Sequence, residues 1–191
     1  MFDWKNYYKK HASRKTREQV VRAVALCLVK DHALDLGAGT LIESKFLLKS
    51  GFKKVTAVDN SLETKAFAKK FDPKKFSLRI SDFRDFNFSK NKYNFINAQY
   101  ALPFYGPKNF RNFMKKIKDS LKSGGIFTGQ LFGINDEWNV QGKEIAFQTK
   151  DQALKLLSGL KIIEFKEEEK DGKTASGISK HWHIFHFIAE K

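Results

Sequence analysis

The stretch ALDLGAGT, residues 33–40, places a glycine turn between a short apolar strand and the helix predicted after it. Gly37 and Gly39 carry no Cβ, so the backbone here can approach a ligand closely. In open α/β sheets such a turn lies at the carboxyl ends of the strands, where cofactors bind. The turn therefore predicts an α/β fold with a cofactor site beside it.

A carboxylate follows at the end of the next predicted strand. Asp59 comes 20 residues after Gly39, where an acidic side chain can accept hydrogen bonds from both hydroxyls of a ribose. This spacing predicts an adenosine cofactor, for which a dinucleotide and S-adenosyl-L-methionine compete.

Two features favour S-adenosyl-L-methionine over a dinucleotide. The dinucleotide fingerprint G-x-G-x-x-G has Ile42 in place of its third glycine, and Asp35 would repel a pyrophosphate. An aspartate beside the glycines suits the ammonium of a methionyl group, which lies next to a sulfonium. The sequence therefore favours a cationic cofactor.

The rest of the chain alternates predicted helices and strands and then ends in two successive strands. Apolar spacing and turn residues predict helices at 16–29, capped by Thr16, and at 42–50, 62–71, 107–121 and 149–157; they predict strands at 32–36, 54–58, 76–80, 93–98, 126–132, 161–168 and 182–189. Five βα units followed by a strand pair imply a mostly parallel sheet with helices on both faces and one late antiparallel strand.

Composition limits the class of protein. The 191 residues, 22.1 kDa, suit one domain. The single cysteine excludes a disulfide framework, and the chain has neither a membrane span nor a signal peptide, so we expect a cytoplasmic protein. The net charge is +15, but most cations are lysines scattered along the chain. A nucleic-acid partner is therefore possible but not favoured.

These motifs, in this order, resemble the class I S-adenosylmethionine-dependent methyltransferases. The resemblance covers nearly the whole chain and rests on DLGAGT, VTAVDNS, SDFRDF, INAQYALPF and SLKSGGIFTGQLFG. The segments NYYKKHASRKTR, LFGINDEW and KHWHIFHFIAEK look like small bacterial methyltransferases grouped with tellurite-resistance proteins. The resemblance implies a single Rossmann-like domain with a seven-stranded sheet of order 3-2-1-4-5-7-6, strand 7 being antiparallel.

The resemblance also implies a set of cofactor-binding residues. The methionyl group would lie beside Asp35, Gly37, Ala38 and Gly39, and the ribose beside Asp59, Asn60 and Ser61. The adenine would lie beside Asp82 and Phe83, and the residues at the end of strand 4 are Asn97 and Ala98. The product would be S-adenosyl-L-homocysteine. Many relatives have a glycine or polar residue at the position of Leu41, a departure that bears on where the helix begins.

Candidate substrate and catalytic residues lie near the ends of strands 4, 5 and 7. Tyr100 keeps the last position of the [DNS]-P-P-[YF] pattern of amine methyltransferases, whose prolines are absent here, which argues against adenine or glutamine N-methylation. Residues 136–138 follow strand 5, and we assign substrate contacts to Asp136, Trp138 and Trp182. His181 or His183 is the candidate base, because an imidazole titrates near neutral pH.

The three histidines of HWHIFH do not predict a metal site. His181 and His183 share one strand face, whereas His186 points to the other and is expected in the core. No cysteine lies close enough to complete a ligand set, so no metal is expected.

Residues 1–15 form a predicted N-terminal arm over the cofactor, and residues 16–191 form the methyltransferase domain. The arm's aromatic and basic residues show no core period, and we expect an arginine, Arg14 or Arg17, near the methionyl carboxylate. Trp4, Tyr7 and Tyr8, with Trp138 and Trp182, are either core residues or an aromatic wall.

The leading hypothesis is methyl transfer to a small-molecule acceptor, such as tellurite. A methyltransferase of RNA or another macromolecule is the first alternative, motivated by the charge and by the basic predicted helix at 107–121. A cofactor-binding protein without transferase activity is the second. The aspartates of the cofactor site cannot distinguish this second alternative from an enzyme, because all of them serve cofactor binding alone.

Overall fold

The computed structural model describes residue 8, residues 13–174 and residues 177–191. Its elements, in chain order, are α2 (Glu18–Leu26), β1 (His32–Leu36), α3 (Ile42–Lys49), β2 (Lys54–Asp59), α4 (Thr64–Ala68), β3 (Phe76–Ile80), β4 (Tyr93–Ala98), the 3-10 helix η1 (Leu102–Tyr105), α5 (Phe110–Ser120), β5 (Leu121–Gly133), β6 (Phe147–Gln148), α6 (Lys150–Leu156), β7 (Lys161–Lys173) and β8 (Ser179–Glu190).

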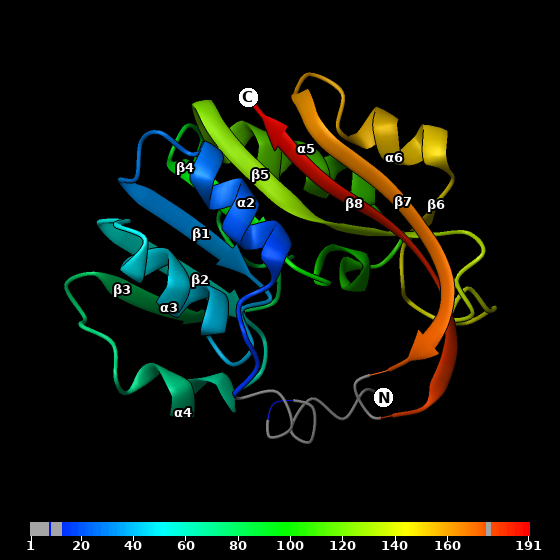
Figure 1. Ribbon diagram of the computed structural model, residues 1–191, viewed down its shortest axis with the longest axis horizontal. Coiled ribbons are helices and arrows are strands. Elements are labelled where there is room, and N and C mark those ends of the chain that lie inside the picture. Colours follow the sequence, from blue (N-terminus) through cyan, green and yellow to red (C-terminus); the bar gives the residue numbers. More distant parts are fainter. Residues whose placement is uncertain (1–7, 9–12, 175–176) are drawn as a thin grey trace.

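One twisted sheet holds all the strands, in the order β3-β2-β1-β4-β5-β8-β7 (Figure 1). The pairs from β3 to β5 are parallel, and β8 runs antiparallel to both β5 and β7. This confirms the expected sheet order and the late antiparallel strand. One strand was not predicted: the two-residue β6, which pairs with the end of β5.

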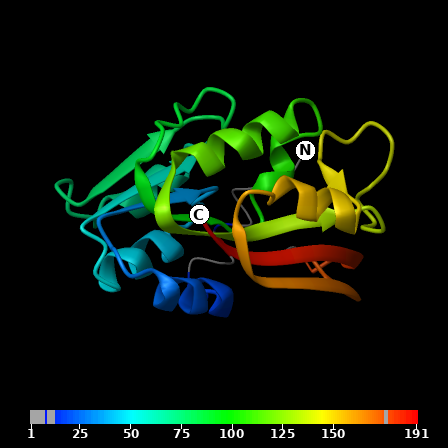
Figure 2. The same ribbon diagram turned by 90° about the horizontal axis from the view of Figure 1, so that it is seen from above.

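Helices cover both faces of the sheet. Figure 2 shows α2 and α3 on one side and α5 and α6 on the other. Because successive strand residues point to opposite faces, β4 contributes Phe95 to the core under α2 and α3 and Ile96 to the core under α5 and α6. The fold buries an apolar layer on each side of one sheet, as a doubly wound α/β domain requires.

Several predicted elements are confirmed in detail. The strands at 32–36, 76–80 and 93–98 have the predicted bounds. Thr149 caps α6 through a capping box, in which its side chain accepts from Gln152 N and the Gln152 side chain accepts from Thr149 N. A serine or threonine followed three residues later by glutamine is a reliable start signal.

Other predicted boundaries are wrong, and strand pairing explains one of them, at Leu121. The helix predicted from Thr16 begins after Arg17, without a side-chain cap, and ends at Leu26, so Leu28 is 93% exposed. Leu121, predicted in the helix before it, begins β5 and pairs with Tyr93. The helix expected at 62–71 is only Thr64–Ala68.

The terminal hairpin is longer than predicted. The strands β7 and β8 pair from Lys161 opposite Glu190 to Lys173 opposite Ser179. Since β5 pairs with β8 only as far as Phe132 opposite Ile184, the hairpin extends past the carboxyl end of β5. It therefore forms a wall beside the end of the sheet that carries the candidate site. No described helix is long and apolar enough to cross a membrane.

Candidate cofactor and acceptor site

Asp35 lies in the sheet beneath the glycine turn. It pairs in register with Asn97 of the neighbouring parallel strand, and Asn97 Nδ2 donates to Asp35 Oδ1 at 2.7 Å. Ser44 Oγ of α3 donates to the other carboxyl oxygen at 2.6 Å. Burial, assisted by the nearby Glu43 carboxylate, raises the pKa of Asp35 to about 7. The strands thus hold a buried carboxyl group where a cation would be favoured.

Asp59 joins the glycine turn to the end of β2. Its carboxylate accepts from Gly39 N at 2.8 Å and from Ser61 N at 2.9 Å. The Tyr8 hydroxyl donates to the same carboxylate at 3.1 Å, and burial together with Asp59 raises the pKa of Tyr8, so this hydroxyl stays protonated. A ribose hydroxyl that binds Asp59 must share this carboxylate with Tyr8 or replace it there.

Gly37 is in close contact with residues that follow β3 and β4. It has φ +67°, and a Cβ on it would lie 2.5 Å from Ala101 Cβ and 3.7 Å from Phe83 Cζ. Only glycine meets both the backbone and the space requirement here. The turn therefore brings Phe83, which is expected to contact adenine, next to Gly37, which is expected to contact the methionyl group.

The remaining expected cofactor residues differ in what they offer. The Asp82 carboxylate accepts from Arg84 N and forms an ion pair with the Arg84 guanidinium at 3.1 Å. Asn60 is exposed, and Ala38 is buried at the turn. The Ala98 side chain is fully buried in the apolar core, which leaves only its backbone for a ligand.

Arg14 forms a bidentate ion pair with Glu43 in the first turn of α3, both nitrogen–oxygen distances being 2.5 Å. Glu43 is 4% exposed and lies close enough to raise the pKa of Asp35. Arg14 therefore reaches the Asp35 side of the site through Glu43. Of the other arm residues discussed above, Trp4 and Tyr7 lie outside the described residues.

Tyr100 follows β4 in the left-handed backbone region, with φ +54°. Non-glycine residues rarely adopt this conformation, and it is frequent at functional sites. Gln130 Oε1 of β5 holds it by accepting from Tyr100 N at 2.8 Å. The Arg17 guanidinium lies 4.6 Å from the centre of the Tyr100 ring, a cation–π geometry.

A buried glutamine network lies under Tyr100. Gln19 of α2 donates to Thr128 Oγ1, Gly129 O and Phe187 O, at 2.8 to 3.1 Å. Its Oε1 accepts from Gln130 at 2.7 Å and faces His186 Nδ1 at 3.3 Å. The Gln19 amide nitrogen already faces three oxygens, so the Gln19 atom that faces His186 is the carbonyl oxygen, an acceptor. His186 Nδ1 is therefore the donor, and Nε2 carries the lone pair.

His186 is the histidine that the fold brings to Tyr100, with the ring centres 6.4 Å apart. Its Nε2 is buried, has no hydrogen-bond partner among the described residues, and lies 3.8 Å from Glu168 Oε1. Burial lowers the pKa of His186, so the imidazole is neutral at pH 7. The expectation that His186 points to the other face from His181 and His183 is confirmed, but that face is the one Tyr100 shares.

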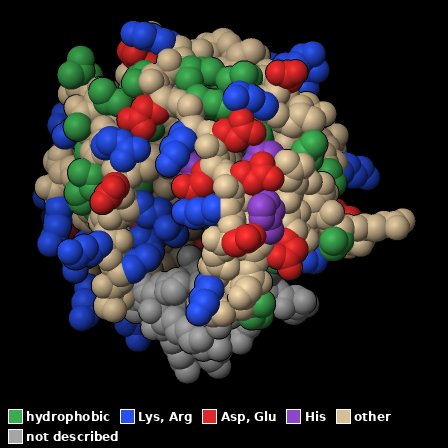
Figure 3. All heavy atoms as spheres, turned by 45° about the vertical axis from the view of Figure 1, so that its right-hand side comes forward, with side chains coloured by type: hydrophobic (Ala, Val, Ile, Leu, Met, Phe, Trp, Pro, Cys, Tyr) green, Lys and Arg blue, Asp and Glu red, His purple; other side chains and the backbone are tan. Residues whose placement is uncertain are grey.

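His181 and His183 instead lie among carboxylates on the opposite face of the hairpin. His181 contacts Asp171 and Glu169, at 2.7 and 3.2 Å, and these hydrogen bonds raise its pKa. His183 is 3% exposed, contacts Glu167 at 3.1 Å and packs on Gly133. Acidic and histidine side chains gather on this surface (Figure 3). No described group of residues there could hold a metal ion.

Asp136, Trp138 and Trp182 surround a buried lysine. Lys180 Nζ forms an ion pair with Asp136 and lies 4.6 and 3.8 Å from the ring centres of Trp138 and Trp182. Asp136 also accepts from Trp138 N and His183 N, so each of its two carboxyl oxygens already has a hydrogen-bond donor. Trp182 reaches the acceptor side, since its ring centre is 6.5 Å from that of Tyr100.

Sequence reasoning missed three contributors to this arrangement: Gln19 of α2, Gln130 of β5, and His186 of β8 as a neighbour of Tyr100. Arg17, expected in the arm near the methionyl carboxylate, instead lies over the Tyr100 ring. Only the alternation in HWHIFH carried a signal, because it puts Trp182 and His186 on one strand face.

The sheet order, the glycine turn and the carboxylates that face it define a Rossmann-like methyltransferase fold. Residues 34–128 match the family described as a methyltransferase domain. This match and the fold identify a methyltransferase domain of the kind found in class I S-adenosylmethionine-dependent methyltransferases, whose cofactor is S-adenosyl-L-methionine.

Solved structures with the same fold have low sequence identity to this chain. TehB from Haemophilus influenzae is 18% identical with a TM-score of 0.77; the match covers 97% of this chain but only 65% of TehB. An S-adenosylmethionine-dependent methyltransferase from Methanosarcina mazei is 19% identical, TM-score 0.67, with 93% and 99% of the two chains covered.

A third similar structure contains both a demethylated cofactor and a small-molecule substrate. The 1,6-didemethyltoxoflavin-N1-methyltransferase from Burkholderia thailandensis, with 1,6-didemethyltoxoflavin and S-adenosylhomocysteine bound, is 18% identical, TM-score 0.62, covering 91% of this chain and 78% of that one. No curated protein matches the chain in sequence.

Proposed function

We propose that the protein transfers a methyl group from S-adenosyl-L-methionine to a small anionic acceptor held against Tyr100. The observation that carries the proposal is the Arg17 guanidinium over the Tyr100 ring, 4.6 Å from its centre, at the carboxyl end of β4. A cation and aromatic side chains beside a cofactor site suit a small anionic or polarisable acceptor. Tellurite is one such acceptor.

The described residues fit the cofactor. Asn97 Oδ1 is buried, has no hydrogen-bond partner in the part of the chain that the structure describes, and lies on the side chain that holds Asp35, so it can accept from the methionyl ammonium. Asp59 can accept from the ribose, and Phe83 beside Gly37 offers a face for adenine. When bound, S-adenosyl-L-methionine supplies a methyl group already activated on a sulfonium.

The protein's own part is then alignment, exclusion of water and, for some acceptors, removal of a proton. Trp182 and Tyr100 form an apolar wall. His186 Nε2 is a buried basic atom of this face, and Glu168, 3.8 Å away, would stabilise the imidazolium. Where the nucleophile of the acceptor carries a proton, His186 Nε2 would take it.

A methyl-transfer assay tests this function. The protein is incubated with methyl-labelled cofactor and a panel of small metabolites that includes tellurite and selenite, with total RNA as a parallel arm. Label in a small-molecule product is expected. Label in RNA alone would overturn the small-molecule assignment, whereas cofactor binding without labelling of either arm would identify a binding protein. An Asp59→Ala variant controls for contaminating activity, with Asp72→Ala, an exposed carboxylate elsewhere, as its match.

Asp35 predicts that cofactor affinity depends on pH. With the pKa of Asp35 near 7, its carboxyl is largely protonated below pH 7, whereas the cofactor ammonium favours the ionised form. The dissociation constant, measured by calorimetry, should therefore rise as pH falls below 7, approaching about tenfold per pH unit, and level off above pH 7. Asp35→Asn should bind more weakly and lose most of this dependence; an unchanged pH profile in the variant would assign it to another group.

A further inference from the structure

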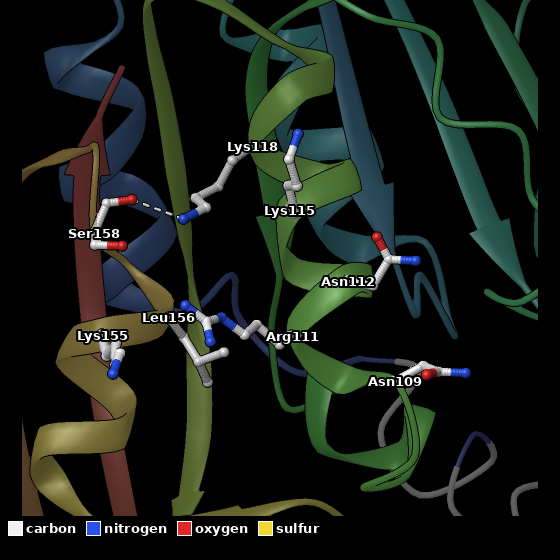
Figure 4. A pocket seen from close by; sticks show the side chains of 8 residues that line it. All are labelled: Asn109, Arg111, Asn112, Lys115, Lys118, Lys155, Leu156 and Ser158. Carbon is white, nitrogen blue, oxygen red and sulfur yellow. Dashed lines mark hydrogen bonds between the residues drawn. The ribbon is translucent and has the colours of Figure 1, made fainter.

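A basic groove runs between α5 and α6, on the face of the sheet opposite α2 and α3 (Figure 4). Its volume is about 540 Å³. The lining residues are Asn109, Arg111, Asn112, Lys115, Lys118, Lys155, Leu156 and Ser158. Four of these eight are cations and none is acidic, so the groove concentrates the positive charge that is otherwise scattered over the chain.

Only part of this charge is neutralised. Lys115 pairs with Asp119 at 2.6 Å, and Lys118 Nζ donates to Ser158 O at 2.7 Å. Neither Arg111 nor Lys155 has an ion-pair partner within the described residues, and both are exposed. The repulsion among cations on α5 acts on Lys118, whose pKa is lowered by burial and further by Lys115 and Arg111, while Asp119 raises it. An anion in the groove would relieve this crowding.

The cations form a line along α5. Arg111, Lys115 and Lys118 are spaced by four and three residues, so they share one helix face and extend over about 10 Å of its axis. Lys155 of α6 faces this line across the groove in Figure 4. A line of that length spans about three intervals of the ~3.4 Å charge spacing of one nucleic-acid strand, and so about four successive phosphates. A single small anion would not contact its whole length.

The lining also indicates which part of a nucleic acid would be bound. No aromatic side chain lines the groove, so bases have no surface on which to stack. Lysine is a point charge suited to phosphate, while Asn109, Asn112 and Ser158 add neutral hydrogen-bonding groups of the kind that contact phosphate and sugar. The groove thus suits a backbone and offers little to read a base sequence.

We propose that the α5–α6 groove binds the sugar–phosphate backbone of a nucleic-acid strand without sequence preference. This site lies on the other side of the sheet from Arg17 and Gln19, and it does not depend on which acceptor is methylated. Binding in this groove would keep the protein attached to a nucleic-acid strand through charge alone, whatever its base sequence.

Fluorescence anisotropy with a labelled oligouridine of about 20 nucleotides tests the proposal. The triple variant Arg111→Gln/Lys115→Gln/Lys155→Gln changes only exposed side chains. We expect its dissociation constant to rise about tenfold, and the slope of log affinity against log salt to shrink by about 2, as for three lost single-strand phosphate contacts. Oligouridine and oligothymidine should bind alike.

The control is Lys69→Gln/Lys70→Gln/Lys74→Gln, which removes the same charge from exposed lysines around the end of α4. It should leave the dissociation constant within about twofold. Equal weakening by both triples would show a general charge effect and overturn the proposal, as would no binding by the unaltered protein at low salt. Full displacement of the oligonucleotide by an equal phosphate concentration of inorganic tripolyphosphate would also overturn it, in favour of a small-anion site. Calorimetry of the cofactor with each variant checks folding.

Discussion

Replacing Asp59 with alanine should weaken the binding of S-adenosyl-L-methionine by about 10- to 150-fold. The carboxylate is 4% exposed and is held by two backbone N–H groups, from Gly39 and Ser61. Removing a charged hydrogen-bond acceptor costs roughly 1.5–3 kcal/mol, which corresponds to this range of affinity. Isothermal titration calorimetry with cofactor and with demethylated product measures it.

Two further variants separate ligand contact from loop structure. Asp59→Asn keeps an oxygen for one backbone N–H but loses the charge, so it should fall between alanine and the unaltered protein. Tyr8→Phe keeps the ring over Gly39 and removes the hydroxyl that shares the carboxylate, so affinity should not decrease. If Asp59→Ala bound the cofactor normally, or if all variants bound NADH more tightly, the ribose assignment would be wrong.

The part of the fold that sequence could predict is the part governed by local patterns. The strand 32–36 has the predicted bounds because its apolar run is closed by two glycines. The strand 93–98 also has its predicted bounds. The 20-residue spacing from Gly39 to Asp59 also pointed to two residues that are close in space, since Gly39 N donates to Asp59 Oδ2 at 2.8 Å.

The boundaries that failed depend on contacts with distant residues. Leu121 continues the apolar period of α5, yet it leaves the helix because it pairs with Tyr93 of β4. The helical face predicted up to Val29 ends at Leu26, since the backbone is already extended at Cys27. No local pattern shows that a neighbouring strand is in place to receive a residue.

The acceptor side of the site shows the same limit more strongly. Gln19 and Gln130 are 111 residues apart in sequence and joined by a hydrogen bond of 2.7 Å. A glutamine in a helix and one in a strand carry no motif, so neither pointed to a site. The histidines show a further limit: alternation along the strand separates His186 from His181 and His183, but it does not show which of the two faces meets Tyr100.

The largest expected effect belongs to His186. For an acceptor whose nucleophile carries a proton, such as a hydroxyl, thiol or amine, His186→Gln should lower turnover by about 10²- to 10⁴-fold with little change in cofactor affinity. The reason is the buried Nε2 lone pair beside Tyr100 and Trp182, which glutamine cannot supply as a base. Turnover is measured on the acceptor identified by the labelled-methyl screen.

His181→Gln is the matched control, because that side chain lies on the opposite face among Asp171 and Glu169 and its loss should leave turnover nearly unchanged. The pH profile adds a second reading: with His186 as base, turnover should fall as acid protonates Nε2, and this limb should disappear in His186→Gln. For an oxyanion such as tellurite, which has no proton to lose, the same substitution should cost far less. Full turnover by His186→Gln on a protonated acceptor would remove the base from the mechanism and leave alignment by Arg17, Tyr100 and Trp182 as the protein's whole contribution.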